Sequence, residues 1–94
     1  GYHRIGWIIR QPAPCDASML MAGVDGISAE RKKGMFLTNE GWRRVNQDEW
    51  RPIDTPADHR SRLEVIDPSP LDVSTLDAGL RRVLRADRTR SSVG

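Results

Sequence analysis

The segment MFLTNEGWRRVNQDEWRPI, residues 35–53, gives the strongest indication of how this chain is built. Two polar stretches, residues 39–41 and 46–49, divide the segment into three short runs that are rich in aromatic and apolar side chains. Polar turns between runs of this kind are typical of β-hairpins. The segment therefore predicts two successive hairpins, and with them an antiparallel sheet.

A helix is the competing interpretation of the same segment. Thr38 carries a hydroxyl group that favours a helix N-cap, and Trp42 and Val45 would then lie on one helical face. The sequence leaves both interpretations open between residues 38 and 50, and we take the hairpins as the prediction.

Two further strands are predicted, one on each side of this segment. Residues 2–10, YHRIGWIIR, carry apolar side chains at Ile5, Trp7 and Ile9 before the strand-breaking run QPAP. Residues 62–67, RLEVID, alternate charged and apolar side chains, which is typical of a strand with one buried face.

Two other segments are ambiguous. Residues 16–24, DASMLMAGV, fit a short helix capped by Asp16, but Met19 and Met21 alternate as in a strand, and a strand is our prediction. Residues 28–34 are expected to form a polar loop or a single helical turn that ends at glycine.

The clearest helix is predicted over residues 75–86. Ser74 or Thr75 can cap this helix, and its apolar residues recur at helical spacing, so that they form one face with arginines on the other side. The residues of the apolar face are Leu76, Leu80, Val83 and Leu84.

These elements predict an α+β fold. A small, mainly antiparallel sheet of four to five strands would carry one C-terminal amphipathic helix packed on it. Residues 1–88 are expected to form a single small domain, and residues 89–94 a flexible basic C-terminal tail.

Arginine is the distinctive residue type of this chain. All of its cationic side chains except Lys32 and Lys33 are arginines, although the net charge is only +2. Arginine and tryptophan are enriched at the centres of binding interfaces, because a guanidinium group pairs with anions and stacks on aromatic rings. GC-rich coding DNA produces the same arginine excess, so composition alone does not define a binding surface.

Catalytic and metal-binding patterns are not found in the sequence. Cys15 lies in a proline-rich segment without a nucleophile signature, and it would need His3 or His59 as a base. Two distant histidines and one cysteine do not provide the ligand spacing of a zinc site. We therefore predict that the chain is not an enzyme, binds no cofactor or metal, and has no small-molecule substrate.

The single cysteine also bears on the compartment. One cysteine excludes an internal disulfide, which favours an intracellular reducing compartment such as the cytoplasm or an organelle matrix. No apolar run reaches the roughly 18 residues of a membrane-spanning helix, and the N-terminus does not resemble a signal peptide. We expect neither membrane insertion nor secretion.

Interaction with a partner is thus the expected function. We predict a non-catalytic accessory or structural subunit that docks on a larger assembly, such as a viral particle, a ribonucleoprotein or an organellar complex. One alternative is direct RNA or DNA binding through the basic C-terminal helix and the Arg-Trp hairpin, and another is a small inhibitor that occludes a partner's active site. Core packing is the competing interpretation of the tryptophans. The candidate partner-binding residues are Trp42, Arg43, Arg44, Trp50, Arg51, Arg81, Arg82, Arg85 and Arg88.

Overall fold

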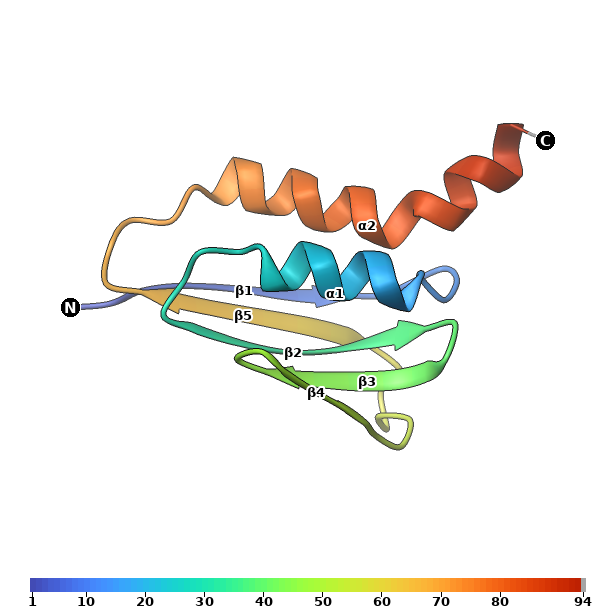
Figure 1. Ribbon diagram of the computed structural model, residues 1–94, viewed down its shortest axis with the longest axis horizontal. Helices are drawn as coiled ribbons and strands as arrows, with labels where there is room; N and C mark the ends of the chain where they lie inside the picture. Colours follow the sequence, from blue (N-terminus) through green and yellow to red (C-terminus); the bar gives the residue numbers. More distant parts are fainter. Residues whose placement is uncertain (94) are drawn as a thin grey trace.

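Two layers make up the fold, a five-stranded antiparallel sheet and a pair of helices that both lie on one of its faces (Figure 1). The computed structural model describes the backbone of residues 1–93 and the side chains of residues 1–84. The predicted α+β class, with a C-terminal helix packed on the sheet, is confirmed. The elements are β1 (His3–Ile9), α1 (Ala17–Asp25), β2 (Arg31–Thr38), β3 (Gly41–Asn46), β4 (Glu49–Pro52), β5 (Ser61–Asp67) and α2 (Val73–Val93).

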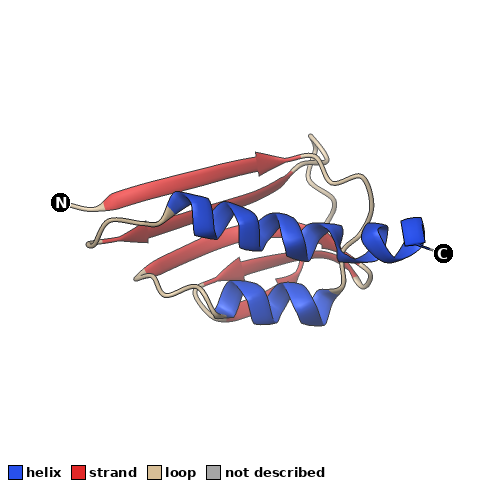
Figure 2. Ribbon diagram, turned by 90° about the horizontal axis from the view of Figure 1, so that it is seen from above, coloured by secondary structure: helices blue, strands red, loops and turns tan. Residues whose placement is uncertain are grey.

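The last strand in the chain lies inside the sheet. The strand order is β1-β5-β2-β3-β4, and every neighbouring pair is antiparallel. β1 and β2 therefore run in the same direction on either side of β5, and α1 connects them, which is a split β-α-β arrangement. In the view from above, α2 covers the β1 and β5 side of the sheet and α1 covers the other side (Figure 2).

The two predicted hairpins are confirmed. In the turn between β2 and β3, the Thr38 hydroxyl donates to the Gly41 carbonyl at 2.7 Å, and Gly41 has a φ of 101°, which favours glycine. In the turn between β3 and β4, Gln47 has a φ of 62°. The Gln47 side-chain oxygen accepts the Lys32 backbone N–H at 2.8 Å, so this side chain ties the turn to β2.

The strand prediction for residues 16–24 is wrong, because this segment forms helix α1. The carboxylate of Asp16 accepts the backbone N–H of Met19 at 2.9 Å, which is an N-cap. Leu20 and Val24, four residues apart, are both buried, whereas Met19 is 42% exposed. Helical spacing of buried residues thus outweighs the alternation of the methionines.

The loop or turn predicted for residues 28–34 is also partly wrong, because β2 already begins at Arg31. The first half of β2 pairs with β5, with Lys32 opposite Val65 and Lys33 opposite Glu64. Residues 31–34 are extended because they pair with β5, a strand that comes much later in the chain.

Helix α2 is longer than predicted and starts at another cap. The Asp72 carboxylate accepts the backbone N–H of Thr75 at 3.1 Å and its hydroxyl at 2.8 Å, so Asp72 occupies the position predicted for Ser74 or Thr75. The backbone stays helical to Val93 instead of ending near residue 86. The predicted mobility of residues 89–94 stays a prediction.

The core lies between the sheet and the helices. One row of paired residues crosses the whole sheet on this side, from Trp7 on β1 to Trp50 on β4. The indole N–H of Trp7 donates to Asp77 of α2, and that of Trp50 donates to Asp25 of α1, both at 3.1 Å. Each edge strand therefore holds one helix. The buried apolar residues are Cys15, Ala17, Leu20, Val24, Phe36, Val45, Leu63, Val65, Leu80 and Leu84.

Candidate functional site

The face of the sheet that is turned away from both helices is the candidate site, and we call it the open face. Side chains alternate between the two faces along each strand, so pairing register determines which of them share the open face. On β5, for example, Leu63 and Val65 are buried toward the helices, whereas Arg62 and Glu64 are only half-buried.

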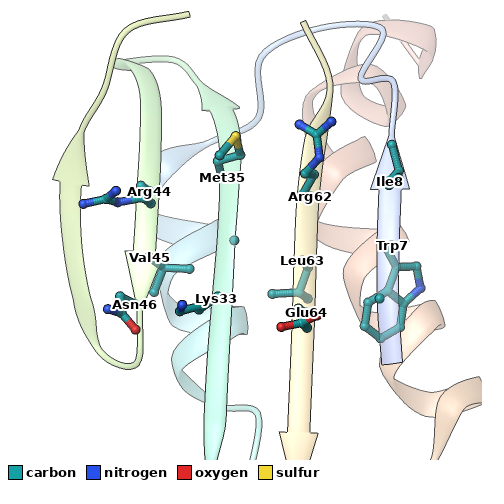
Figure 3. A pocket seen from close by; sticks show the side chains of 12 residues that line it. Trp7, Ile8, Lys33, Met35, Arg44, Val45, Asn46, Arg62, Leu63 and Glu64 are labelled. Atoms are coloured by element: carbon teal, nitrogen blue, oxygen red, sulfur yellow. The ribbon is translucent and has the colours of Figure 1, made fainter. Parts of the chain in front are cut away.

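Five side chains of the open face form one row that crosses all five strands. The pairing is Ile8 with Arg62, Arg62 with Met35, Met35 with Arg44, and Arg44 with Arg51. Figure 3 shows the first four of these side chains next to one another on β1, β5, β2 and β3. We call this set, Ile8, Arg62, Met35, Arg44 and Arg51, the arginine row.

The neighbouring rows differ in character. On one side, Lys33 lies opposite Glu64, which also pairs with Arg4 at 3.9 Å, so the charges in this row offset one another. On the other side, Trp42 lies opposite Leu37. The arginine row thus lies between a row in which opposite charges offset one another and a row that is aromatic and apolar.

The net charge of the open face is positive. Its strands contribute six cationic side chains and two glutamates, and Asp58 of the following loop adds a third carboxylate beside Arg62. The resulting excess of three positive charges is larger than the net charge of +2 of the whole chain. The cationic residues are Arg4, Arg31, Lys33, Arg44, Arg51 and Arg62.

Ion pairs neutralise some members of the arginine row and leave Arg44 unpaired among the described residues. Arg62 donates to the Asp58 carboxylate, and this bond, together with the Arg60 backbone N–H, lowers the pKa of Asp58 from its ordinary value of 3.8. Arg51 donates from Nε to Glu49 at 2.7 Å. Within residues 1–84, Arg44 has neither an ion pair nor a side-chain hydrogen bond, and it is exposed.

Arg44 and Arg51 are directly opposite each other on β3 and β4. Like charges at directly opposed positions of a sheet are destabilising. Glu49 offsets the charge of Arg51, so Arg44 carries the unbalanced charge of this pair and is the candidate for function.

The three tryptophans divide between the two faces. Trp7 and Trp50 pack against the core and donate to carboxylates of the helices. Trp42 is half-buried on the open face, and no acceptor for its indole N–H is found among the residues that the structure describes. The core interpretation therefore holds for Trp7 and Trp50, and Trp42 is the tryptophan available to a partner.

The candidate residues from the sequence do not form a single surface. Trp42, Arg44 and Arg51 share the open face, but Trp50 and Arg43 lie on the side of the helices, where Arg43 pairs with Glu40 at 3.2 Å. Arg81 and Arg82 lie on α2 in the helical layer, and Arg81 donates to Asp77 at 2.8 Å. The side chains of Arg85 and Arg88 lie outside the described residues.

Other members of the open face were not among the sequence candidates. Ile8, Met35, Lys33 and Arg62 join it because β5 pairs with both β1 and β2. The alternation of residues 62–67 already placed Arg62 and Glu64 on an outer face, but only the strand order shows which side chains lie beside them. A shallow depression of about 650 Å³ follows this face, lined in part by Ile8, Met35, Arg44 and Arg62.

Other kinds of site find less support in the described part of the chain. No group of three or more histidine, cysteine or acidic side chains is placed there to hold a metal ion. Cys15 is buried, and its thiol donates to the Leu37 carbonyl at 3.3 Å. Among the described residues, neither helix has the length and apolar character that crossing a membrane requires.

Comparisons with known proteins do not identify a family or a structural neighbour of this chain. No protein-family model matches the chain, and neither the curated proteins nor the solved structures contain one that is significantly similar to it.

Proposed function

We propose that this chain is a non-catalytic interaction subunit that docks on a larger macromolecular assembly through the open face of its sheet. The helices and the core occupy the other face, so the open face offers binding residues that folding does not use. Arg44, Met35 and Trp42 lie within adjacent rows of this face. A partner would contact them without disturbing the helical layer.

The observation that carries the proposal is the exposed Arg44, which lies opposite Arg51 and has no ion pair within residues 1–84. Glu49 offsets the charge of Arg51, whereas Arg44 has no such pair among the described side chains, so an anionic partner would supply the missing opposite charge. In the helical layer, Arg81 is paired with Asp77, whereas the exposed Arg82 has no ion pair within residues 1–84. The combination of an unpaired Arg44 with a net positive charge on the same face supports the open face as the docking surface.

The test compares two charge reversals that differ only in the layer they affect. The tagged chain is recovered from extracts of its natural source as wild type, as Arg44→Glu on the open face, and as Arg82→Glu on the exposed side of α2. We expect Arg44→Glu to lower the amount of co-purified assembly by about tenfold or more, as for a central interface residue. Arg82→Glu should recover the assembly at the wild-type level.

We do not expect Arg44→Glu to lose the assembly through misfolding. Arg44→Glu places opposite charges at positions 44 and 51, so the variant should unfold at a temperature at least as high as the wild type. If Arg44→Glu and Trp42→Ala both retain the assembly, the open face is not the docking surface and the proposal is overturned.

A further inference from the structure

The chemistry of the open face indicates which class of partner it fits. The central part of a protein–protein interface is depleted of charged residues. Arginine, tryptophan and methionine are exceptions that protein interfaces also favour, but the three middle strands of the open face add Lys33 to Arg62 and Arg44 and so concentrate positive charge. Interfaces with nucleic acid are much more positively charged than interfaces between proteins. The charge distribution therefore favours a nucleic acid.

The geometry of the row agrees with a chain of phosphates. Neighbouring strands lie about 4.8 Å apart, so Arg62 on β5 and Arg51 on β4, three strand spacings apart, are separated by roughly 14 Å. Arg44 lies between them. Three guanidinium groups are thus arranged along a line that crosses the strands, where a nucleic-acid backbone lying across the sheet would meet each of them.

Trp42 supplies the second element of such a site. Trp42 and Arg44 are two positions apart on β3, so they share the open face about 7 Å from each other. An indole beside a guanidinium allows a base to stack while its phosphate is bound. Bases of a duplex are already paired and stacked, so this arrangement fits an unpaired strand.

We propose that the open face binds a segment of single-stranded nucleic acid, with Arg44, Arg51 and Arg62 contacting phosphates and Trp42 stacking on a base. This inference rests on the proposed docking function and names the component of the assembly that is bound. Met35 and Ile8 provide apolar surface within the same row. Arg51 and Arg62 would exchange their carboxylate partners, Glu49 and Asp58, for phosphates.

The primary test measures binding of a fluorescein-labelled 12-nucleotide oligouridylate to the full chain by fluorescence anisotropy. The association constant should fall with salt, and each phosphate contact should contribute about −0.7 to the slope of its logarithm against the logarithm of salt concentration. Arg44→Gln should weaken binding by about fivefold and make the slope less negative by about 0.7. Arg82→Gln removes the same charge from α2. Its association constant should stay within about twofold of the wild-type value, and its salt slope within about 0.2.

A second measurement examines stacking. Binding should quench tryptophan fluorescence in the wild type, and Trp42→Ala should abolish most of this quenching and weaken binding by at least about fivefold. Because Trp42 is half-buried, the Ala variant is first checked for a cooperative unfolding transition. If it does not fold, the exposed Arg44 variant and the salt slope still test the inference.

The remaining outcomes separate this inference from the docking function. Absence of saturable oligonucleotide binding at low salt, equal affinity for a duplex, or equal affinity for polyglutamate of the same charge would each overturn the single-strand inference. If any of these is seen while Arg44→Glu still loses the assembly, the chain docks through the open face on an acidic protein surface or a duplex instead. If the oligonucleotide binds but Arg44→Glu retains the assembly, the docking function is wrong.

Discussion

Lys32 shows how a residue that looks like surface charge in the sequence can be structural. It is 8% exposed, and its ammonium group donates to the backbone carbonyls of Val24 at 3.1 Å and Asp25 at 3.3 Å. These carbonyls belong to the last turn of α1, where helix dipoles favour a positive charge. Lys33, the next residue, lies exposed on the open face. The two lysines of this chain therefore have different roles.

Replacing each lysine by methionine should separate these roles. Lys32→Met removes two charge-assisted hydrogen bonds from a buried site, so we expect the free energy of unfolding to fall by about 2 kcal/mol. Lys33→Met should change it by no more than about 0.5 kcal/mol. Urea denaturation of both variants measures the difference. Equal stability of the two variants would show that Lys32 does not stabilise α1.

Gly34 is the position in the sheet that is most sensitive to volume. A Cβ atom there would lie 2.6 Å from the Arg62 carbonyl oxygen and 3.0 Å from Cε2 of Phe36, in the middle of the sheet. The backbone of β5 would have to move to accept it. We expect Gly34→Ala to lower the free energy of unfolding by about 3 kcal/mol.

Gly79 provides the matched control for this substitution. A Cβ atom at Gly79 meets no heavy atom within 4 Å, and the residue lies inside helix α2. Gly79→Ala should therefore raise the free energy of unfolding by roughly 0.5–1 kcal/mol, because alanine favours the helix. Thermal denaturation gives both values. A destabilised Gly79→Ala or an unaffected Gly34→Ala would contradict these local geometries.

At the scale of elements, the caps of the helices explain what the sequence could and could not show. Asp16 was recognised as a possible cap, but the alternation of Met19 and Met21 outweighed it, and the period-two pattern was misleading because Met19 is exposed. For α2, the apolar stripe was predicted correctly, whereas the cap was assigned to Ser74 or Thr75. Asp72 is the cap because its carboxylate reaches both donors of Thr75. Helix interiors are thus easier to predict than their first turns.

The cap of α2 also makes a prediction about pH. Hydrogen bonds from the N–H and the hydroxyl of Thr75 lower the pKa of Asp72 below its ordinary value of 3.8. A folded-state pKa below the unfolded value means that the stabilisation is fully present above pH 3.8 and is lost as the pH falls through the folded-state pKa. We expect the wild type to melt a few degrees above Asp72→Asn at pH 7, and this difference to close near pH 2.

The comparison with Asp72→Asn separates the stabilisation due to the negative charge of Asp72 from the stabilisation due to its capping hydrogen bonds. Asparagine caps a helix nearly as well as aspartate, but it does not titrate. All other carboxylates titrate in both proteins, so their effects cancel in the difference of melting temperatures. A difference that stays constant from pH 7 to pH 2 would show that the charge of Asp72 does not stabilise α2.

At the scale of the whole molecule, the placement of β5 decides both the fold and the site. Residues 62–67 were predicted as a strand with one buried face, and this is confirmed. Its partners were not predicted, because alternation fixes which face is buried but not which strands are adjacent. Those partners bring Ile8, Arg62 and Met35 into one row. The arginines of residues 43–51 could be found in the sequence, but the surface that they share with β5 and β1 could not.

The central position of β5 leads to the last prediction. β1 pairs with no strand except β5 in the described sheet, and the paired residues are at least 52 positions apart in the sequence. A fragment of residues 1–60 would leave β1 without a partner and expose Phe36, Leu20 and Val24. We therefore expect this fragment to show no cooperative thermal transition by circular dichroism, whereas the full chain unfolds in a single transition.

A cut chain serves as the control for this fragment. Residue 57 lies in the loop between β4 and β5 and is exposed, so we expect a protease site there to be tolerated, because cleavage removes no strand or helix. The cleaved protein, with both pieces present, should keep the cooperative transition, because β5 still lies between β1 and β2. Cooperative unfolding of the isolated 1–60 fragment would show that these residues fold without β5 and α2 and would contradict the prediction.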